Sequence, residues 1–262
     1  MQLAGLQKTT LVDFPGKVAA TVFTRGCSFR CHFCHNPELV IPEQFLEQIP
    51  EQEFFDFLIS RLGKLQGVCI TGGEPLLHVD ADKFISHIKA LGFAVKLDSN
   101  GSFPDRLEKI ISDGDVDYIA MDIKSPLNKY LMVTNFQNPN DKLQINYKSQ
   151  SSKNKNFCHS ERSEESQSDR NNLTDKIKES INLIISSGID YEFRTTVCHP
   201  LHEVSDFKEI GKMIKGAKRY YIQNFVQSKH VNPKYSFKPF SDKELKDGLK
   251  IISGYVNSAQ IR

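Results

Sequence analysis

The sequence predicts an α/β fold, built as an incomplete barrel of parallel strands with the form of a partial (β/α)6 barrel. Short apolar runs rich in β-branched and aromatic residues alternate with segments whose apolar residues follow helical spacing. Alternating strands and helices form a parallel sheet with right-handed connections. About six such units are too few for a closed eight-stranded barrel. With 262 residues and 39% apolar content, residues 1–262 are expected to form one domain.

Several elements have clear end signals. Isoleucines between 177 and 185 mark one face of a helix, and Gly188 supplies a left-handed terminus for it. Asp80 precedes another helix, and Ser241 with Glu244 forms the capping-box pattern of the last one. The expected strands lie at 18–24, 67–71, 94–98, 116–122, 191–197 and 219–225.

One stretch, at about 133–172, interrupts the alternation. It is dominated by polar residues with hardly any spaced apolar ones, and it is therefore predicted to be a disordered surface insertion. Its segment 157–166 resembles a peptide translated from repetitive bacterial DNA elements, which would make the insertion a passenger. We expect no metal site at Cys158 and His159, because a mobile loop cannot preorganise ligands.

The composition narrows the classes of partner and compartment. A net charge of +2 indicates neither a nucleic-acid partner nor an anionic membrane surface. The sequence has no secretory leader pattern and no apolar run long enough to span a bilayer, so a cytoplasmic location is expected. Three of the six cysteines lie within eight residues, a distribution that indicates metal binding in a reducing compartment rather than a disulfide framework.

These three cysteines, Cys27, Cys31 and Cys34, follow the first predicted strand and can converge on one metal centre. A 4Fe-4S cluster held by three thiolates keeps one iron open to a substrate, as a reactive centre requires. The alternative is a zinc site with His35 as the fourth ligand. Spacing alone does not exclude zinc.

A second motif favours the cluster. Thr71, Gly72, Gly73, Glu74 and Pro75 follow the second predicted strand, where paired glycines let the backbone approach a ligand closely. Loops that follow neighbouring barrel strands lie beside one another, so this turn is expected next to the cysteines. A zinc loop would not require it.

The cysteine loop together with the Gly-Gly-Glu-Pro turn resembles the radical S-adenosylmethionine (SAM) superfamily. The resemblance implies a TIM-type partial barrel with SAM across the carboxyl ends of the strands. It also implies that the methionyl amine and carboxylate of SAM chelate the fourth iron. By position, Phe33 would lie beside the adenine, and the turn from Gly72 to Pro75 would accept hydrogen bonds from the methionyl amino group.

Further motifs are similar to those of activases of glycyl-radical enzymes. They are the Leu-Val-Asp-Phe-Pro-Gly-Lys run at 11–17, the Cys-His-Asn-Pro-Glu-Leu run at 34–39, the Asp-Ser-Asn-Gly turn at 98–101 and the Asp-Ile-Lys turn at 122–124. The His35-Asn36 pair most resembles the activating protein of anaerobic ribonucleoside-triphosphate reductase. His199 and Pro200 depart from the Pro-Gly turn expected in these activases.

The resemblance assigns roles to the polar strand ends. Lys124 would bind the SAM carboxylate, Ser99 and Asn100 would contact the cofactor, and Arg194 would meet SAM or the partner's peptide. In the related pyruvate formate-lyase activase, corresponding positions hold a monovalent cation. The residues that would do so here are Asp98, Ser99, Met121 and Asp122.

The function implied is reductive cleavage of SAM to a 5′-deoxyadenosyl radical, which takes a hydrogen atom from a glycine of a partner enzyme. The expected partner is anaerobic ribonucleotide reductase in a transient complex, with flavodoxin or ferredoxin as the electron donor. The alternatives are an activase of the pyruvate formate-lyase type and a small-molecule radical SAM enzyme such as 7-carboxy-7-deazaguanine synthase. In the latter, Asp-Thr usually follows the cysteine loop instead of His35 and Asn36.

Overall fold

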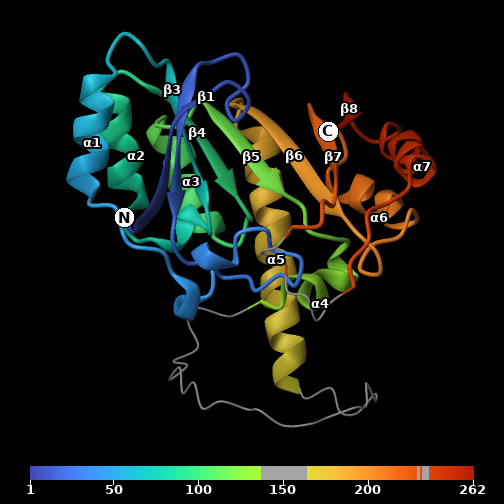
Figure 1. Cartoon of the computed structure of the whole chain (residues 1–262). Helices are drawn as coiled ribbons and strands as arrows, with labels where there is room; N and C mark the ends of the chain where they lie inside the picture. The colour runs from blue at the N-terminus through green and yellow to red at the C-terminus, as the bar shows by residue number, and fades with distance from the viewer. Residues whose placement is uncertain (137–163, 229–230, 232–235) are drawn as a thin grey trace.

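The computed structural model describes residues 1–136, 164–228, 231 and 236–262, with the backbone alone for 164–171 (Figure 1). Its centre is one eight-stranded sheet whose strands lie in the order in which they occur in the chain. The strands are β1 (Leu3–Thr10), β2 (Ala19–Thr24), β3 (Gly67–Gly72), β4 (Ala94–Ser99), β5 (Tyr118–Asp122), β6 (Asp190–Val197), β7 (Tyr220–Asn224) and β8 (Ala259–Ile261).

The sheet confirms the predicted partial barrel and extends it at both edges. The six predicted strands form β2 to β7, and all are parallel. Two strands were missed: β1 runs antiparallel to β2, and the three-residue β8 pairs with β7. β1 was missed because only part of it is buried, so its sequence lacks a continuous apolar run.

The helices cover the sheet in neighbouring pairs. Figure 1 shows α1 beside α2 near one edge, α6 and α7 near the other, and α5 running past the end of the sheet. In the part of the chain that is described, no helix has the length and apolar character to cross a bilayer. The helices are α1 (Glu51–Ser60), α2 (Ala81–Ala90), α3 (Pro104–Asp113), α4 (Tyr130–Thr134), α5 (Glu164–Ser186), α6 (Asp206–Met213) and α7 (Asp242–Ile252). Short 3-10 turns are η1 (Pro37–Leu39), η2 (Pro42–Gln44), η3 (Pro75–Leu77) and η4 (Leu127–Lys129).

The predicted helix ends are confirmed in two of three cases. Gly188 has φ of 75° just after α5, and Ser241 and Glu244 form both hydrogen bonds of a capping box on α7. Asp80 precedes α2 as expected, but its side chain does not cap the helix. It pairs instead with the amino group of Met1, because that charged group lies within reach.

Helix faces and strands share one apolar core. Phe84 of α2 stacks on Phe54 of α1 with ring centroids 5.3 Å apart. On α5, Ile177, Ile181 and Ile184 are buried, as their spacing predicts. This core lies between the helices and the sheet. The carboxyl ends of the strands are therefore available for a functional site.

The predicted insertion at 133–172 is narrower than its composition indicates. Val133 belongs to α4 and is fully buried, packed in a cluster with Phe33 and Phe225. At the other end, α5 already begins at Glu164. The packing of Val133 overrides local composition at the first end, and α5 extends over the last residues of the predicted insertion. Cys158 and His159 lie outside the described residues, as do the other residues of 137–163.

The pairing of β2 with β3 places the two functional loops in direct contact. Thr24 pairs with Gly72 at the carboxyl ends of these strands. Beyond them, Gly73 N donates to Thr24 O at 2.9 Å, and Glu74 N donates to Gly26 O at 2.8 Å. A Cβ on Gly73 would lie 1.9 Å from Gly26 O, so a side chain at this position would meet backbone. The approach of the loops therefore depends on a glycine.

Gly73→Ala should lower the free energy of unfolding by about 3 kcal/mol, because backbone atoms of two loops must separate to admit the methyl group. Urea titration of the metal-free protein measures this. Gly254→Ala is the matched control, since its Cβ would meet only Ile251 O at an ordinary 3.5 Å. Equal stabilities of the two variants would contradict the prediction.

Candidate active site

The cysteine loop leaves the end of β2 and lines a pocket at the carboxyl edge of the sheet. Cys27, Cys31 and Cys34 are all partly buried in its wall. Arg30 anchors the loop, since its amide donates to Thr134 O of α4 at 2.8 Å. Phe29 packs edge-on against Tyr130 with centroids 6.3 Å apart. Both contacts are made with α4, so the protein itself holds the loop against this helix.

Burial keeps these thiols protonated when no metal is bound. It raises the pKa of Cys27 to about 12, with a further contribution from the Glu74 carboxylate. Burial also raises the pKa of Cys31 to about 12, although the Lys124 cation opposes the change. Because metals bind thiolates, iron must displace a proton from each sulfur.

Two donors point at one of the sulfurs. Phe29 N lies 3.3 Å from Cys27 Sγ, and the side-chain amide of Asn100 lies 3.6 Å from it. Hydrogen bonds of this kind tune the reduction potential of an iron–sulfur cluster. The surroundings of the sulfur therefore fit a cluster ligand.

The geometry of the ligand groups also bears on the zinc alternative. A zinc ion requires its sulfur ligands about 2.3 Å from one point. Among the described residues, no three His, Cys, Asp or Glu side chains form a group that could hold a single metal ion. In a 4Fe-4S cluster each thiolate takes a different iron, so its ligands stand further apart. The described residues therefore contain no preformed set of zinc ligands around the three cysteines.

The Gly-Gly-Glu-Pro turn lies beside the cysteines, as predicted, but its members have different places. Gly72 and Gly73 line the pocket, whereas Glu74 and Pro75 do not. Glu74 is fully buried and accepts hydrogen bonds from Ser99 Oγ at 3.0 Å and Asn100 N at 2.6 Å. The carboxylate of Glu74 therefore links loops inside the protein and lies outside the pocket lining.

The opposite wall of the pocket is strongly charged. Arg194 of β6 lies between two carboxylates: its Nε is 2.8 Å from Asp122 Oδ1, and its Nη1 is 3.3 Å from Asp98 Oδ2. Lys124 Nζ is 2.9 Å from Asp122 Oδ2, and Lys96 pairs with Asp98 Oδ1. Every oxygen of the two aspartates therefore has a side-chain cation as its partner.

The other two predicted ligands of a monovalent cation, Ser99 and Met121, also contact other parts of the protein. Ser99 Oγ donates to Glu74, and the side chain of Met121 is buried against Gly101. This donor set does not fit the predicted cation site. The sequence analysis named Lys124 and Arg194 as site residues but did not predict that they, together with Lys96, pair with the two aspartates.

Residues 21–149 match the radical SAM superfamily. The chain carries a radical SAM domain. A protein of Methanocaldococcus jannaschii, named provisionally as a glycyl-radical enzyme activating enzyme, is 27% identical over 99% of this chain and 95% of its own length. Pyruvate formate-lyase-activating enzyme of Listeria monocytogenes is 38% identical, over 43% of this chain and 49% of that enzyme. The fold matches that of SuiB from Streptococcus suis with a TM-score of 0.61 and 11% identity, over 92% of this chain and 48% of SuiB.

The structure brings most of the predicted site residues of this radical SAM domain into one pocket. The predicted residues that line it are Cys27, Cys31, Phe33, Cys34, His35, Gly72, Gly73, Asp98, Ser99, Asn100, Asp122, Lys124 and Arg194. Glu74, Pro75 and Met121 are the predicted residues outside its lining.

Three further residues were missed by the sequence reasoning. Phe29 and Val40 line the pocket as apolar neighbours of the cysteines. Lys96 does not line it but supports Asp98 from behind, with only 2% of its surface exposed. Its signal was available in the sequence: Lys96 and Asp98 are two residues apart on a strand and so share one face.

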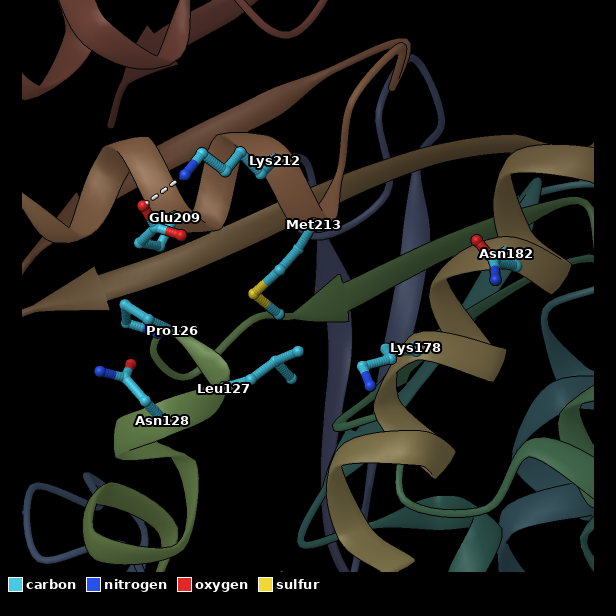
Figure 2. Close-up of a pocket in the computed structure, with 8 residues that line it drawn as sticks. All are labelled: Pro126, Leu127, Asn128, Lys178, Asn182, Glu209, Lys212 and Met213. Carbon is cyan, nitrogen blue, oxygen red and sulfur yellow. Dashed lines mark hydrogen bonds and ion pairs between the residues drawn. The ribbon is translucent and has the colours of Figure 1, made fainter. Parts of the chain in front are cut away.

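A second pocket of the radical SAM domain lies on the outer side of the barrel, where η4, α5 and α6 meet (Figure 2). Its lining includes Lys178 and Asn182 of α5 together with the Glu209–Lys212 pair of α6. It contains none of the predicted site residues. The candidate active site is therefore the pocket at the strand ends.

Glu74 should make stability depend on pH. Burial raises its pKa from 4.5 to about 7 in spite of three hydrogen bonds to the carboxylate. The folded protein then binds a proton that the unfolded chain releases, so between pH 4.5 and 7 this group lowers the free energy of unfolding by about 3 kcal/mol as pH rises.

Urea titrations of the metal-free wild type and of Glu74→Gln, each at pH 4.5 and at pH 7, test this pH dependence. Half-buried His78 and buried His202 have lowered pKa values and act in the opposite direction, so the quantity to follow is the difference between the two proteins. The stability lost by the variant should shrink as pH rises. A pH-independent difference would show that Glu74 does not titrate in this range.

Proposed function

We propose that this protein activates a glycyl-radical enzyme by cleaving SAM reductively at a 4Fe-4S cluster bound by Cys27, Cys31 and Cys34. The observation that carries the proposal is the pocket itself, in which the three thiols lie with Asp98, Ser99 and Asn100 at the end of β4 and with Asp122 and Lys124 at the end of β5. The full-length similarity to a protein named as such an activating enzyme supports the same function. The other described cysteines, Cys69 and Cys198, are buried outside the pocket lining.

Cys27, Cys31 and Cys34 would hold the cluster, which when reduced would supply the one electron needed to cleave the SAM sulfonium into methionine and a 5′-deoxyadenosyl radical able to take a hydrogen atom from glycine. Lys124, on the charged wall and near enough for its charge to act on Cys31, supplies a cation for the carboxylate of SAM. Phe33 and Val40 make the cysteine side partly apolar, which helps to exclude water from a reactive species. Asn100 orients Cys27 and completes the wall beside the turn at Gly72 and Gly73.

Arg194 receives a different role in this proposal from the one first expected. Its guanidinium bridges Asp98 and Asp122, so its hydrogen bonds serve the pocket wall. We therefore assign it to positioning the two aspartates rather than to binding SAM or the partner's peptide.

The partner we propose is anaerobic ribonucleotide reductase, on the basis of the His35-Asn36 motif after the last cysteine. A glycine loop of the partner would enter the open side of the pocket in a transient complex, and flavodoxin or ferredoxin would supply electrons. The proposed location is the cytoplasm, where thiols stay reduced. A second candidate partner is pyruvate formate-lyase, favoured by the 38% identity to its activating enzyme over half of that enzyme's length.

Cluster binding is tested by anaerobic reconstitution with iron and sulfide. The wild type should turn brown and hold about four irons per chain, whereas Cys31→Ala should lose nearly all of both. Cys198→Ala is the control, because this cysteine is buried but lies outside the pocket lining. A zinc-loaded, colourless wild type would overturn the cluster proposal.

The activase function is tested by mixing the reconstituted protein with SAM, a strong reductant and each candidate partner. Electron paramagnetic resonance should detect a glycine-centred radical on anaerobic ribonucleotide reductase and not on pyruvate formate-lyase. The opposite pattern would transfer the proposal to the second partner. Formation of 5′-deoxyadenosine without a radical on either partner would contradict activation of both.

A further inference from the structure

Five charged side chains form a continuous chain of ion pairs along the pocket wall. Lys96 and Asp98 project from β4, Asp122 and Lys124 follow β5, and Arg194 projects from β6. Parallel pairing of these strands brings the residues together, since Asp98 precedes the Ser99–Met121 pair and Asp122 pairs with Arg194. The sheet register therefore fixes the order of charges.

The chain alternates in sign from end to end. Lys96 lies against Asp98 Oδ1, and Asp98 Oδ2 is 3.3 Å from Arg194 Nη1. Arg194 Nε continues to Asp122 Oδ1 at 2.8 Å, and Asp122 Oδ2 ends at Lys124 Nζ at 2.9 Å. A metal cation that bound these carboxylates would lie beside three basic side chains and be repelled by their charge.

Lys96 is the least accessible member of the chain. Only 2% of its surface is exposed, and its Nζ also lies 3.6 Å from Cys69 Sγ. A buried ammonium is costly unless it is paired. Its position is thus explained by the charge of Asp98.

We propose that Lys96 and Arg194 supply, as fixed parts of the protein, the positive charge that a monovalent metal cation would otherwise bring to Asp98 and Asp122. The inference rests on the proposed function, because SAM is the ligand of this pocket. The chain then binds SAM without requiring sodium or potassium. Lys96 is a positioning residue that acts through Asp98.

The electrostatics of the pair agree with this assignment. Burial alone would raise the pKa of Asp98, but the charges of Arg194 and Lys96 hold it below its ordinary value. Burial would lower the pKa of Lys96, but Asp98 raises it. Both groups are therefore charged at neutral pH, as an internal counter-ion requires.

The first test uses the wild-type holoprotein. SAM affinity by calorimetry and the rate of 5′-deoxyadenosine formation are compared in potassium chloride, sodium chloride and choline chloride at equal ionic strength. We expect the SAM affinity and the rate of 5′-deoxyadenosine formation each to change less than twofold across the three salts. A loss of tenfold or more in choline would overturn the proposal, and this arm requires no variant to fold.

The second test removes the internal cation. Lys96→Met keeps the length of the side chain but leaves one oxygen of Asp98 without its partner. SAM binding by this variant should be at least tenfold weaker in choline than in potassium, and potassium should restore most of it. Potassium should also raise the melting temperature of the metal-free variant relative to choline, whereas it should leave the wild type unchanged.

Lys89→Met is the matched control. Lys89 pairs with Asp117 at 2.9 Å, outside the pocket lining, so its loss should create no dependence on potassium. A folded Lys96→Met protein that responds equally to all three salts would contradict the role of Lys96. The failures are distinguishable: absence of SAM cleavage by the wild type in every salt counts against the proposed function, whereas cleavage that requires potassium counts against this inference alone.

Discussion

The buried carboxylate of Glu74 is the interaction on which the site most depends, because it joins loops from three strands. Its oxygens accept hydrogen bonds from Leu76 N in its own turn and from Ser99 Oγ and Asn100 N in the turn after β4. Its backbone amide donates to Gly26 O in the cysteine loop. A carboxylate without these donors would be too costly to bury, and a fully bonded one makes the surrounding loops rigid.

Asn100 extends this network to the cysteines. Its amide is held by Glu74, while its side chain donates to Ser28 Oγ at 3.2 Å and lies 3.6 Å from Cys27 Sγ. The position of one thiol is thus determined by hydrogen bonds that do not involve a metal. The half of the pocket near β2, β3 and β4 is organised by such bonds, whereas the half near β5 and β6 is organised by ion pairs around Arg194.

The sequence predicted the elements and the membership of the pocket better than the roles of individual side chains. Alternating strands and helices place Cys27, Asn100 and Lys124 at one edge of a parallel sheet, because all three follow strand ends. Residue type does not show in which direction a side chain points: Glu74 belongs to the turn predicted to contact SAM, and its carboxylate is buried in the protein. Lys96 was overlooked because a lysine within a strand usually lies on a solvated face.

The glycines illustrate the same limit. The pair at Gly72 and Gly73 was interpreted as room for a ligand, yet the nearest atoms to a Cβ at either position belong to the backbone of Thr24 or Gly26. A pair of glycines in a sequence indicates that no side chain fits at these positions. The group that leaves no room belongs to the loop of another strand, and its place depends on the register in which the two strands pair. Both glycines do line the pocket, so the close packing of loops and the shape of the site have one cause.

Three cations, Lys96, Arg194 and Lys124, lie at the aspartates of the far wall, and Arg194 Nη1 also lies 4.0 Å from Glu192 Oε1. Among these cations, Lys124 acts on the thiols: burial raises the pKa values of Cys31 and Cys34, and the charge of Lys124 opposes that rise. Metal binding requires the thiolate forms, so a fixed ammonium nearby offsets part of the cost of ionising buried sulfur. The same ammonium is partly exposed to the pocket and already bonded to Asp122, which fixes its place before any ligand arrives. One preorganised cation can therefore favour both the thiolates of a metal centre and a carboxylate bound beside them.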